Sequence, residues 1–105
     1  MNSYSAPLRD IRFVLFDVLG AEALYQRLGM AHAQRDLLDA VLDEAAKFTE
    51  TVLAPLNVVG DEHGCVYDKN TGAVATPAGF KEAYAQFGAA GWTGLTAPEA
   101  VGGQD

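Results

Sequence analysis

The residue types best suited to chemistry gather in one short stretch, which contains Asp61, Glu62, His63 and Cys65. Carboxylates, imidazoles and thiolates are all metal ligands, and structural zinc sites combine several of them. Side chains in a contiguous run cannot easily aim at one ion, however, and the chain offers no further pair of His or Cys residues. The sequence therefore predicts a solvated loop here, with no metal ligand.

A second stretch, "DKNTG", resembles the start of a calcium-binding loop, with Asp68 and Asn70 at its first and third positions. Such a loop requires glycine at its sixth position and glutamate at its twelfth. Here those positions hold Ala73 and Gly79, so calcium binding is not predicted. Asp, Asn and Gly at this spacing are instead typical of a tight turn.

The remaining candidates are explained without catalysis. His32 lies at an expected helix start with no nucleophile placed for it, and Cys65 has no cationic neighbour to activate its thiol. The glycine-rich ending "GLTAPEAVGG" lacks the strand, the glycine spacing and the lysine of a phosphate-binding loop. Phe80, Tyr84 and Phe87 share one helical face, which is typical of a core. The sequence thus predicts no catalytic, cofactor-binding or metal-binding residue.

Charge and composition exclude some partners. Fourteen Asp and Glu against seven Lys and Arg give the 105 residues a net charge of −7, whereas binding a nucleic-acid backbone requires clustered Lys and Arg. The start "MNSYSAPLRD" lacks the basic and apolar regions of a secretory signal. The longest apolar run, "FVLF", is far too short to span a bilayer. With its single cysteine, the chain is expected to be cytoplasmic, with no nucleic acid partner and no membrane span.

Apolar residues recur at three- and four-residue steps in two regions. From Leu8 the pattern "LRDIRFVLFDVLG" predicts a helix ending at Gly20, followed by a short helix to Gly29. The clearest pattern is "AHAQRDLLDAVLDEAAKFTETVLAPL", where Pro55 is expected to end the helix near Leu53. The polar residues of this helix are expected to point away from the core: Asp39, Asp43, Lys47 and Glu50.

Residues 57–76 are rich in turn-forming residues. Within them "CVYDKNTGAVA" predicts a small hairpin. Thr76 followed by Pro77 is typical of a helix N-cap and first turn, so a further helix is predicted along "PAGFKEAYAQFGAAG" up to Gly91. Three main helices with one hairpin-like insertion indicate a mainly α fold class.

Two long stretches together resemble one branch of the acyl-CoA dehydrogenases, which includes enzymes for long-chain and 3-methylmercaptopropionyl thioesters. "YSAPLRDIRFVLFDVL" is similar to the N-terminal extension of that branch. The pieces "LAPLN", "GDEHG", "TPAGFKEAY", "GW-GL" and "P-x-x-x-GGQ" are similar to its helical N-terminal domain in order and spacing. The resemblance implies that residues 1–31 form the extension and residues 32–105 the first, incomplete part of that domain.

The resemblance further implies a parent flavoprotein oxidoreductase of fatty acid metabolism, several hundred residues long. Such an enzyme transfers a hydride from acyl-CoA to FAD, uses a glutamate base in a C-terminal helical domain, and has electron-transfer flavoprotein as its partner. It is usually a homo-oligomer. No position of this chain matches the family's catalytic, flavin-contacting or CoA-contacting residues. The chain alone, without the remainder of the enzyme, is therefore expected neither to catalyse nor to bind FAD.

Two alternatives stay open at this point: a free-standing helical interaction module, and a truncated remnant without function. A segment separated from its enzyme should leave uncovered side chains among Phe13, Phe16, Phe87 and Trp92. It should then bind a hydrophobic dye and unfold with poor cooperativity. A sharp, two-state unfolding transition of a monomer would favour the module.

Overall fold

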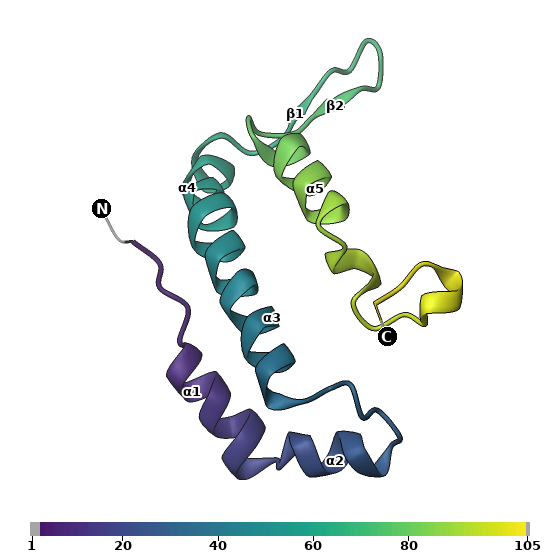
Figure 1. Ribbon diagram of the computed structural model, residues 1–105. Helices are drawn as coiled ribbons and strands as arrows, with labels where there is room; N and C mark the ends of the chain where they lie inside the picture. Colours follow the sequence, from purple (N-terminus) through teal and green to yellow (C-terminus); the bar gives the residue numbers. More distant parts are fainter. Residues whose placement is uncertain (1–2, 105) are drawn as a thin grey trace. The chain divides into compact units, whose positions relative to one another are not determined.

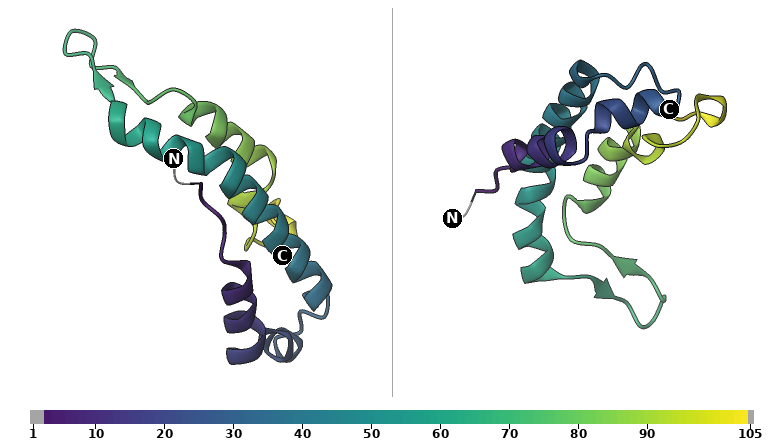
Figure 2. Two further views of the ribbon diagram at one scale, coloured as in Figure 1. Left: turned by 90° about the vertical axis from the view of Figure 1, so that its left-hand side faces the viewer. Right: turned by 90° about the horizontal axis from the view of Figure 1, so that it is seen from below.

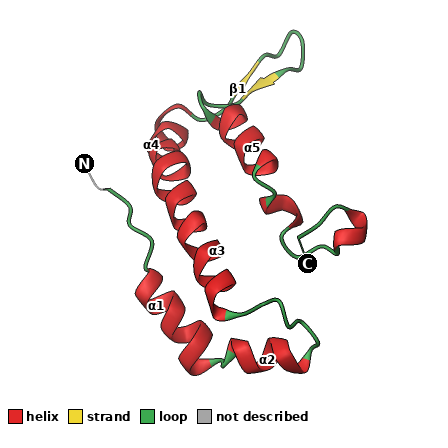
Figure 3. Ribbon diagram, viewed as in Figure 1, coloured by secondary structure: helices red, strands yellow, loops and turns green. Residues whose placement is uncertain are grey.

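Helices make up most of the chain in a computed structural model, which describes residues 3–104 (Figures 1 and 3). The chain divides into two compact units, Met1–Ala54 and Pro55–Asp105. Within the described residues, the only sheet has two antiparallel strands. The predicted mainly α fold with a small hairpin is therefore confirmed.

In the first unit, a helical segment begins with α1 (Leu8–Arg12) and continues as a wider π-helical turn, Phe13–Val18. A second helix, α2 (Ala21–Arg27), comes directly after it. Gly20 between them has a φ of 59°, a left-handed conformation that glycine adopts without steric cost. The predicted end of the first helix and the short helix after it are confirmed.

The long helix was predicted correctly in position but not in its end. It begins as α3 (Arg35–Phe48), passes through a π-helical turn (Thr49–Leu53) and continues as α4 (Ala54–His63). The expected end near Leu53 is therefore wrong. Pro55 lies within this continuous helical segment, directly after the π-helical turn. Such turns accommodate the irregular hydrogen bonding that a proline causes, because its nitrogen carries no hydrogen to donate.

In the second unit, α4 reaches His63, so residues 57–63 are helical although the sequence there is rich in turn-forming residues. The predicted hairpin comes next as β1 (Val66–Tyr67) and β2 (Val74–Ala75), with Val66 opposite Ala75 and Tyr67 opposite Val74. The last α-helix, α5 (Phe80–Ala89), begins after Gly79, whose φ is 89°. The predicted N-cap at Thr76 is therefore wrong, because the chain makes a turn before the helix starts.

Little of the apolar surface is buried within the described residues. The buried apolar residues are mostly alanines: Phe16, Ala21, Ala33, Ala46 and Ala83. The apolar residues that recur along α3 are only half-buried: Leu38, Val41, Leu42, Ala45 and Phe48. Tyr84 is 73% exposed, so the expected core role of Tyr84 is wrong for this chain. Of the side chains that were expected to include uncovered ones, Phe13 is 58% exposed, whereas Phe16 is buried. Apolar side chains as exposed as these mark surfaces available for contact.

Candidate functional site

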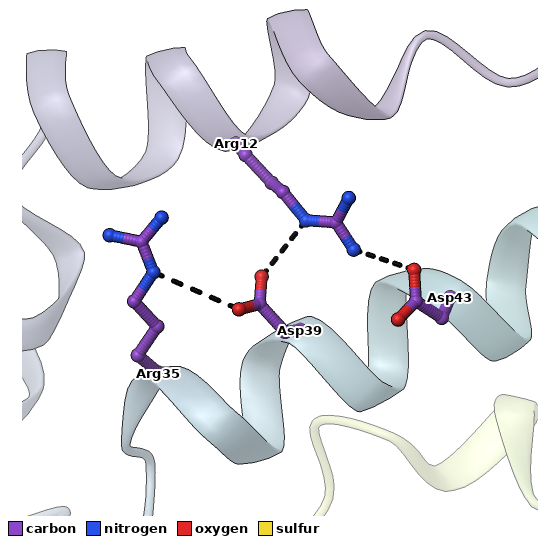
Figure 4. Close-up of polar contacts among 4 residues, drawn as sticks. All are labelled: Arg12, Arg35, Asp39 and Asp43. Atoms are coloured by element: carbon purple, nitrogen blue, oxygen red, sulfur yellow. Dashed lines mark hydrogen bonds and ion pairs between the residues drawn. The ribbon is translucent and has the colours of Figure 1, made fainter.

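The densest polar contact in the first unit joins α1 to α3 through one arginine (Figure 4). Arg12 Nε donates to Asp39 Oδ1 at 2.9 Å, and Arg12 Nη2 donates to Asp43 Oδ1 at 2.6 Å. Arg35 Nε lies 3.7 Å from the other oxygen of Asp39. We call these four residues, Arg12, Arg35, Asp39 and Asp43, the arginine clasp.

The clasp results from helical spacing on both sides. Arg35, Asp39 and Asp43 stand at four-residue steps, which places them along one side of α3. On the facing segment, Phe16 lies one turn after Arg12, and its ring centre is 4.2 Å from the Arg35 guanidinium carbon. A cation over an aromatic face is attracted by the ring's negative charge distribution. The two helices accordingly lie side by side (Figure 2).

A further hydrogen bond holds the chain before α1. The backbone N–H of Ala6 donates to Glu50 Oε1 at 2.7 Å. Asp43 is 61% exposed, as expected, although it also binds Arg12. Asp39 and Glu50, which were also expected to point away from the core, are half-buried against the N-terminal segment. Lys47 does face solvent, with only a long 3.9 Å contact to Glu44. The acidic side of α3 is therefore an attachment surface for residues 6–16.

The electrostatics suit a structural role. Hydrogen bonds to Asp43 and then Asp39 raise the pKa of Arg12 above the ordinary value of an arginine, which is already far above neutrality. The guanidinium therefore stays protonated and cannot act as an acid or base. Its planar fork can instead bind two carboxylates at once, which a lysine cannot do with the same geometry. The clasp positions two helices and offers no proton to a reaction.

The residues that the sequence singled out lie elsewhere. Asp61, Glu62 and His63 form the last turn of α4, where His63 Nδ1 lies 3.2 Å from the Val59 carbonyl oxygen, and Cys65 is exposed beyond the helix end. The expected loop is thus partly helix. No group of three or more His, Cys, Asp or Glu side chains within residues 3–104 is placed to hold a metal ion.

The "DKNTG" stretch makes the contacts of a tight turn. Asp68 Oδ1 accepts from the backbone N–H of Asn70 at 2.8 Å, and Thr71 Oγ1 accepts from that of Ala73 at 3.2 Å. The backbone N–H of Gly72 donates to the Asp68 carbonyl at 2.8 Å. Short polar side chains that bind nearby backbone groups are what close such turns, and the predicted turn is confirmed.

The glycine-rich ending folds back on its own backbone. The N–H groups of Gly102, Gly103 and Gln104 donate to the carbonyls of Glu99, Pro98 and Gly94, at 2.9, 3.0 and 3.0 Å. A Cβ on Gly103 would lie 1.9 Å from the Ala97 carbonyl oxygen. Neither this closed loop nor the clasp was predicted from the sequence. A signal for the clasp was present, since Asp39 and Asp43 are one turn apart, but nothing local identified Arg12 as their partner.

Comparison with known proteins identifies the family. The chain is 33% identical over 101 residues to 3-methylmercaptopropionyl-CoA dehydrogenase of Ruegeria pomeroyi, covering 96% of this chain and 17% of that protein. It is 31% identical over 103 residues to the broad-specificity linear acyl-CoA dehydrogenase FadE5 of Mycobacterium tuberculosis, covering 98% of this chain and 17% of that protein. No protein-family model and no solved structure gives a significant match.

These matches confirm the predicted resemblance: the chain is a segment of the acyl-CoA dehydrogenase type. It spans only 17% of the length of each of these curated relatives. No helix between residues 3 and 104 combines the length and the apolar character that crossing a bilayer requires.

Proposed function

We propose that this chain is the leading segment of an FAD-dependent acyl-CoA dehydrogenase and contributes its structure, not its catalytic groups. The observation that carries the proposal is its similarity, along nearly its whole length, to two such enzymes. In this proposal residues 1–31 form an N-terminal extension, and residues 32–105 begin the helical N-terminal domain. The parent enzyme would oxidise the α,β carbon–carbon bond of an acyl-CoA thioester.

In this proposal the flavin site lies outside this chain. A flavin dinucleotide binds its pyrophosphate through free backbone N–H groups at a glycine-rich turn beside a helix. The only glycine pair of the chain, Gly102 and Gly103, donates its N–H groups to the chain's own carbonyls, and the Ala97 carbonyl leaves no room against Gly103. The clasp arginine Arg12 is likewise engaged by two carboxylates. FAD would therefore bind to the remainder of the parent enzyme.

The same proposal assigns the other partners to the parent enzyme. Acyl-CoA would be its substrate and electron-transfer flavoprotein its electron acceptor, in the cytoplasm, and the parent would be a homo-oligomer. The family resemblance supports these assignments. The chain's own contribution is the pair α1 and α3, joined by the clasp.

A segment exchange tests the proposal. The stretch of the Ruegeria enzyme that aligns with this chain is replaced by residues 1–105, and the product is compared with the natural enzyme and with one lacking that stretch. We expect the exchanged protein to bind flavin and oxidise acyl-CoA with an artificial electron acceptor, and the shortened protein to lose both. An exchanged protein that is folded and soluble but no better than the shortened one would contradict the proposal.

A free-standing interaction module is the second candidate, and the exposure of Phe13 and Tyr84 favours it equally well. Thermal unfolding of the chain alone separates the two. A segment that needs its parent should bind a hydrophobic dye and unfold gradually, whereas a module should bind little dye and unfold in one sharp transition. A remnant without function would behave like the segment in this assay but would fail the segment exchange.

A further inference from the structure

We propose that Lys47 determines the register of the N-terminal segment on α3, because it places a cation one helical turn beyond the two carboxylates that bind Arg12. By register we mean which residues of α3 lie opposite which residues of the segment 3–18. The inference concerns the conformation of the first unit and does not rest on the function proposed above.

The segment runs antiparallel to α3 and is attached to it mainly through charged groups (Figure 4). Its contacts follow one another in reverse order along the helix and the π-helical turn after it: Ala6 with Glu50, Arg12 with Asp43 and Asp39, and Phe16 with Arg35. Of residues 3–18, only Phe16 is buried. Apolar packing therefore does little to hold the segment at one height on the helix, since hydrophobic contact has no direction.

The covalent connection permits a different register. Residues 19–34 join the segment to α3, and they contain α2 together with two glycines in the left-handed conformation, Gly20 and Gly29. Sliding by one helical turn displaces the segment by about 5 Å, a distance that a connection of this length can span. The register must therefore be set by what the segment meets on α3.

Sliding the segment one turn toward the C-terminal end of α3 would bring Arg12 between Asp43 and Lys47. Arg12 would then exchange a carboxylate for an ammonium group, so that repulsion between two cations replaces an attraction. Phe16 would move from a guanidinium onto Asp39, and the negative face of an aromatic ring does not attract a carboxylate. Both changes oppose this register.

Sliding in the other direction is opposed by the start of the helix. Arg12 would come against Arg35, and although Asp36 offers a carboxylate nearby, Arg35 stands directly beside it. Phe16 would pass the first residue of α3 and lose the cation beneath its ring. The natural register is thus bounded by a cation on each side. Of the two, Lys47 takes no part in the clasp, since its ion pair is a long 3.9 Å contact on its own helix.

Moving the charge pattern by one turn tests the proposal. The variant Asp39→Arg with Lys47→Glu carries the order cation, carboxylate, carboxylate at positions 39, 43 and 47, where the natural helix carries it at 35, 39 and 43. We expect the segment to follow the pattern and slide about 5 Å toward the C-terminal end of α3. Asp39→Arg alone is the matched control. It breaks the clasp while Lys47 still blocks the new register, so the segment should be released without a second defined position.

Electron paramagnetic resonance distances between two nitroxide labels measure the register. In a Cys65→Ser background, the labels are attached at Val18→Cys and Thr51→Cys, two exposed positions near opposite ends of the contact. We expect one narrow distance in the natural chain, a distance shorter by about 5 Å in the double variant, and a broad distribution in the control. A natural chain with two distances, or a double variant that keeps the natural distance or is as broad as the control, would overturn the proposal.

A second pair of variants leaves the clasp intact. Lys47→Glu offers Arg12 another pair of carboxylates one turn further along, and Glu50→Ala removes the hydrogen bond that ties the start of the segment to the natural register. In the combined variant, mainly the contact of Phe16 with Arg35 still separates the two registers, so about one molecule in ten should show the shorter distance. Glu50→Ala alone should show only the natural distance. Circular dichroism confirms that each variant keeps its helices, and a combined variant identical to Glu50→Ala would also contradict the proposal.

Discussion

The contact between α4 and α5 makes a sharp prediction about two glycines. A Cβ on Gly60 of α4 would lie 2.7 Å from Cζ of Phe80, whereas a Cβ on Gly88 of α5 would meet nothing within 4 Å. Replacing a glycine within a helix by alanine normally stabilises it by about 1 kcal/mol. Gly88→Ala should therefore stabilise the second unit by about that amount.

Gly60→Ala should behave differently, because the added methyl group would displace the Phe80 ring. Overfilling a packed contact costs about 1–3 kcal/mol, so the gain in helix propensity should be cancelled or reversed. The two alanine variants should then differ in free energy of unfolding by roughly 1–3 kcal/mol, which is the cost of the clash, because the gain in helix propensity is common to both. Thermal unfolding followed by circular dichroism detects a difference of this size as several degrees.

A double-mutant comparison identifies the cause of that difference. In a Phe80→Leu background the clash is relieved, so Gly60→Ala should become stabilising, and the coupling between the two positions should approach the cost of the clash. Gly88→Ala should have the same effect in both backgrounds. If Gly60→Ala and Gly88→Ala raise the unfolding temperature equally in the natural chain, the packing of Phe80 on Gly60 is refuted.

Further predictions concern the first unit and the closing loop. In the Arg12→Lys variant, the lysine cannot bind both carboxylates with one planar group, so amide hydrogen exchange in residues 8–18 should accelerate. High salt should accelerate the same exchange in the natural chain, because it screens the ion pairs. Because the pKa of Arg12 is raised, its charge is fully present from neutral pH up to the ordinary arginine pKa and is lost only as pH rises through the raised value. Exchange corrected for its intrinsic rate should thus be constant from neutral to mildly alkaline pH. Ala46→Leu, at a buried position of α3, should cost about 1–3 kcal/mol. Gly103→Ala should remove the protection of the Gln104 amide from exchange, whereas Gly64→Ala should not.

The sequence predicted the helices better than their ends. Three- and four-residue spacing located the helical segments of the first unit, and turn chemistry located the hairpin, because both signals act between near neighbours. The ends at Pro55 and Thr76 were wrong because several local conformations suit each residue. A proline often ends a helix, but here the helix continues through Pro55 with a π-helical turn before it, a local adjustment that the sequence pattern does not reveal.

The orientation of side chains was harder to predict than the helices themselves. Asp39, Asp43 and Glu50 are charged, and a charged row on an amphipathic helix usually faces water. Here the row binds an arginine and a backbone N–H from a segment more than 25 residues earlier. No local pattern reveals such a pairing, because the partner is chosen by tertiary structure. At the same place Arg12, at the end of α1, contacts α3, while the next residue, Phe13, is exposed.

The contacts of Arg12 with Asp39 and Asp43 help to explain how α1 is oriented on α3 in the first unit. Two apolar helices can slide or rotate past each other with little change in buried area, because the hydrophobic effect has no direction. A guanidinium that binds two carboxylates one turn apart fixes both the register and the rotation of α1 on α3. Phe16 over Arg35 adds a second fixed point one turn away. The clasp thus determines which side of the segment 8–18 stays exposed.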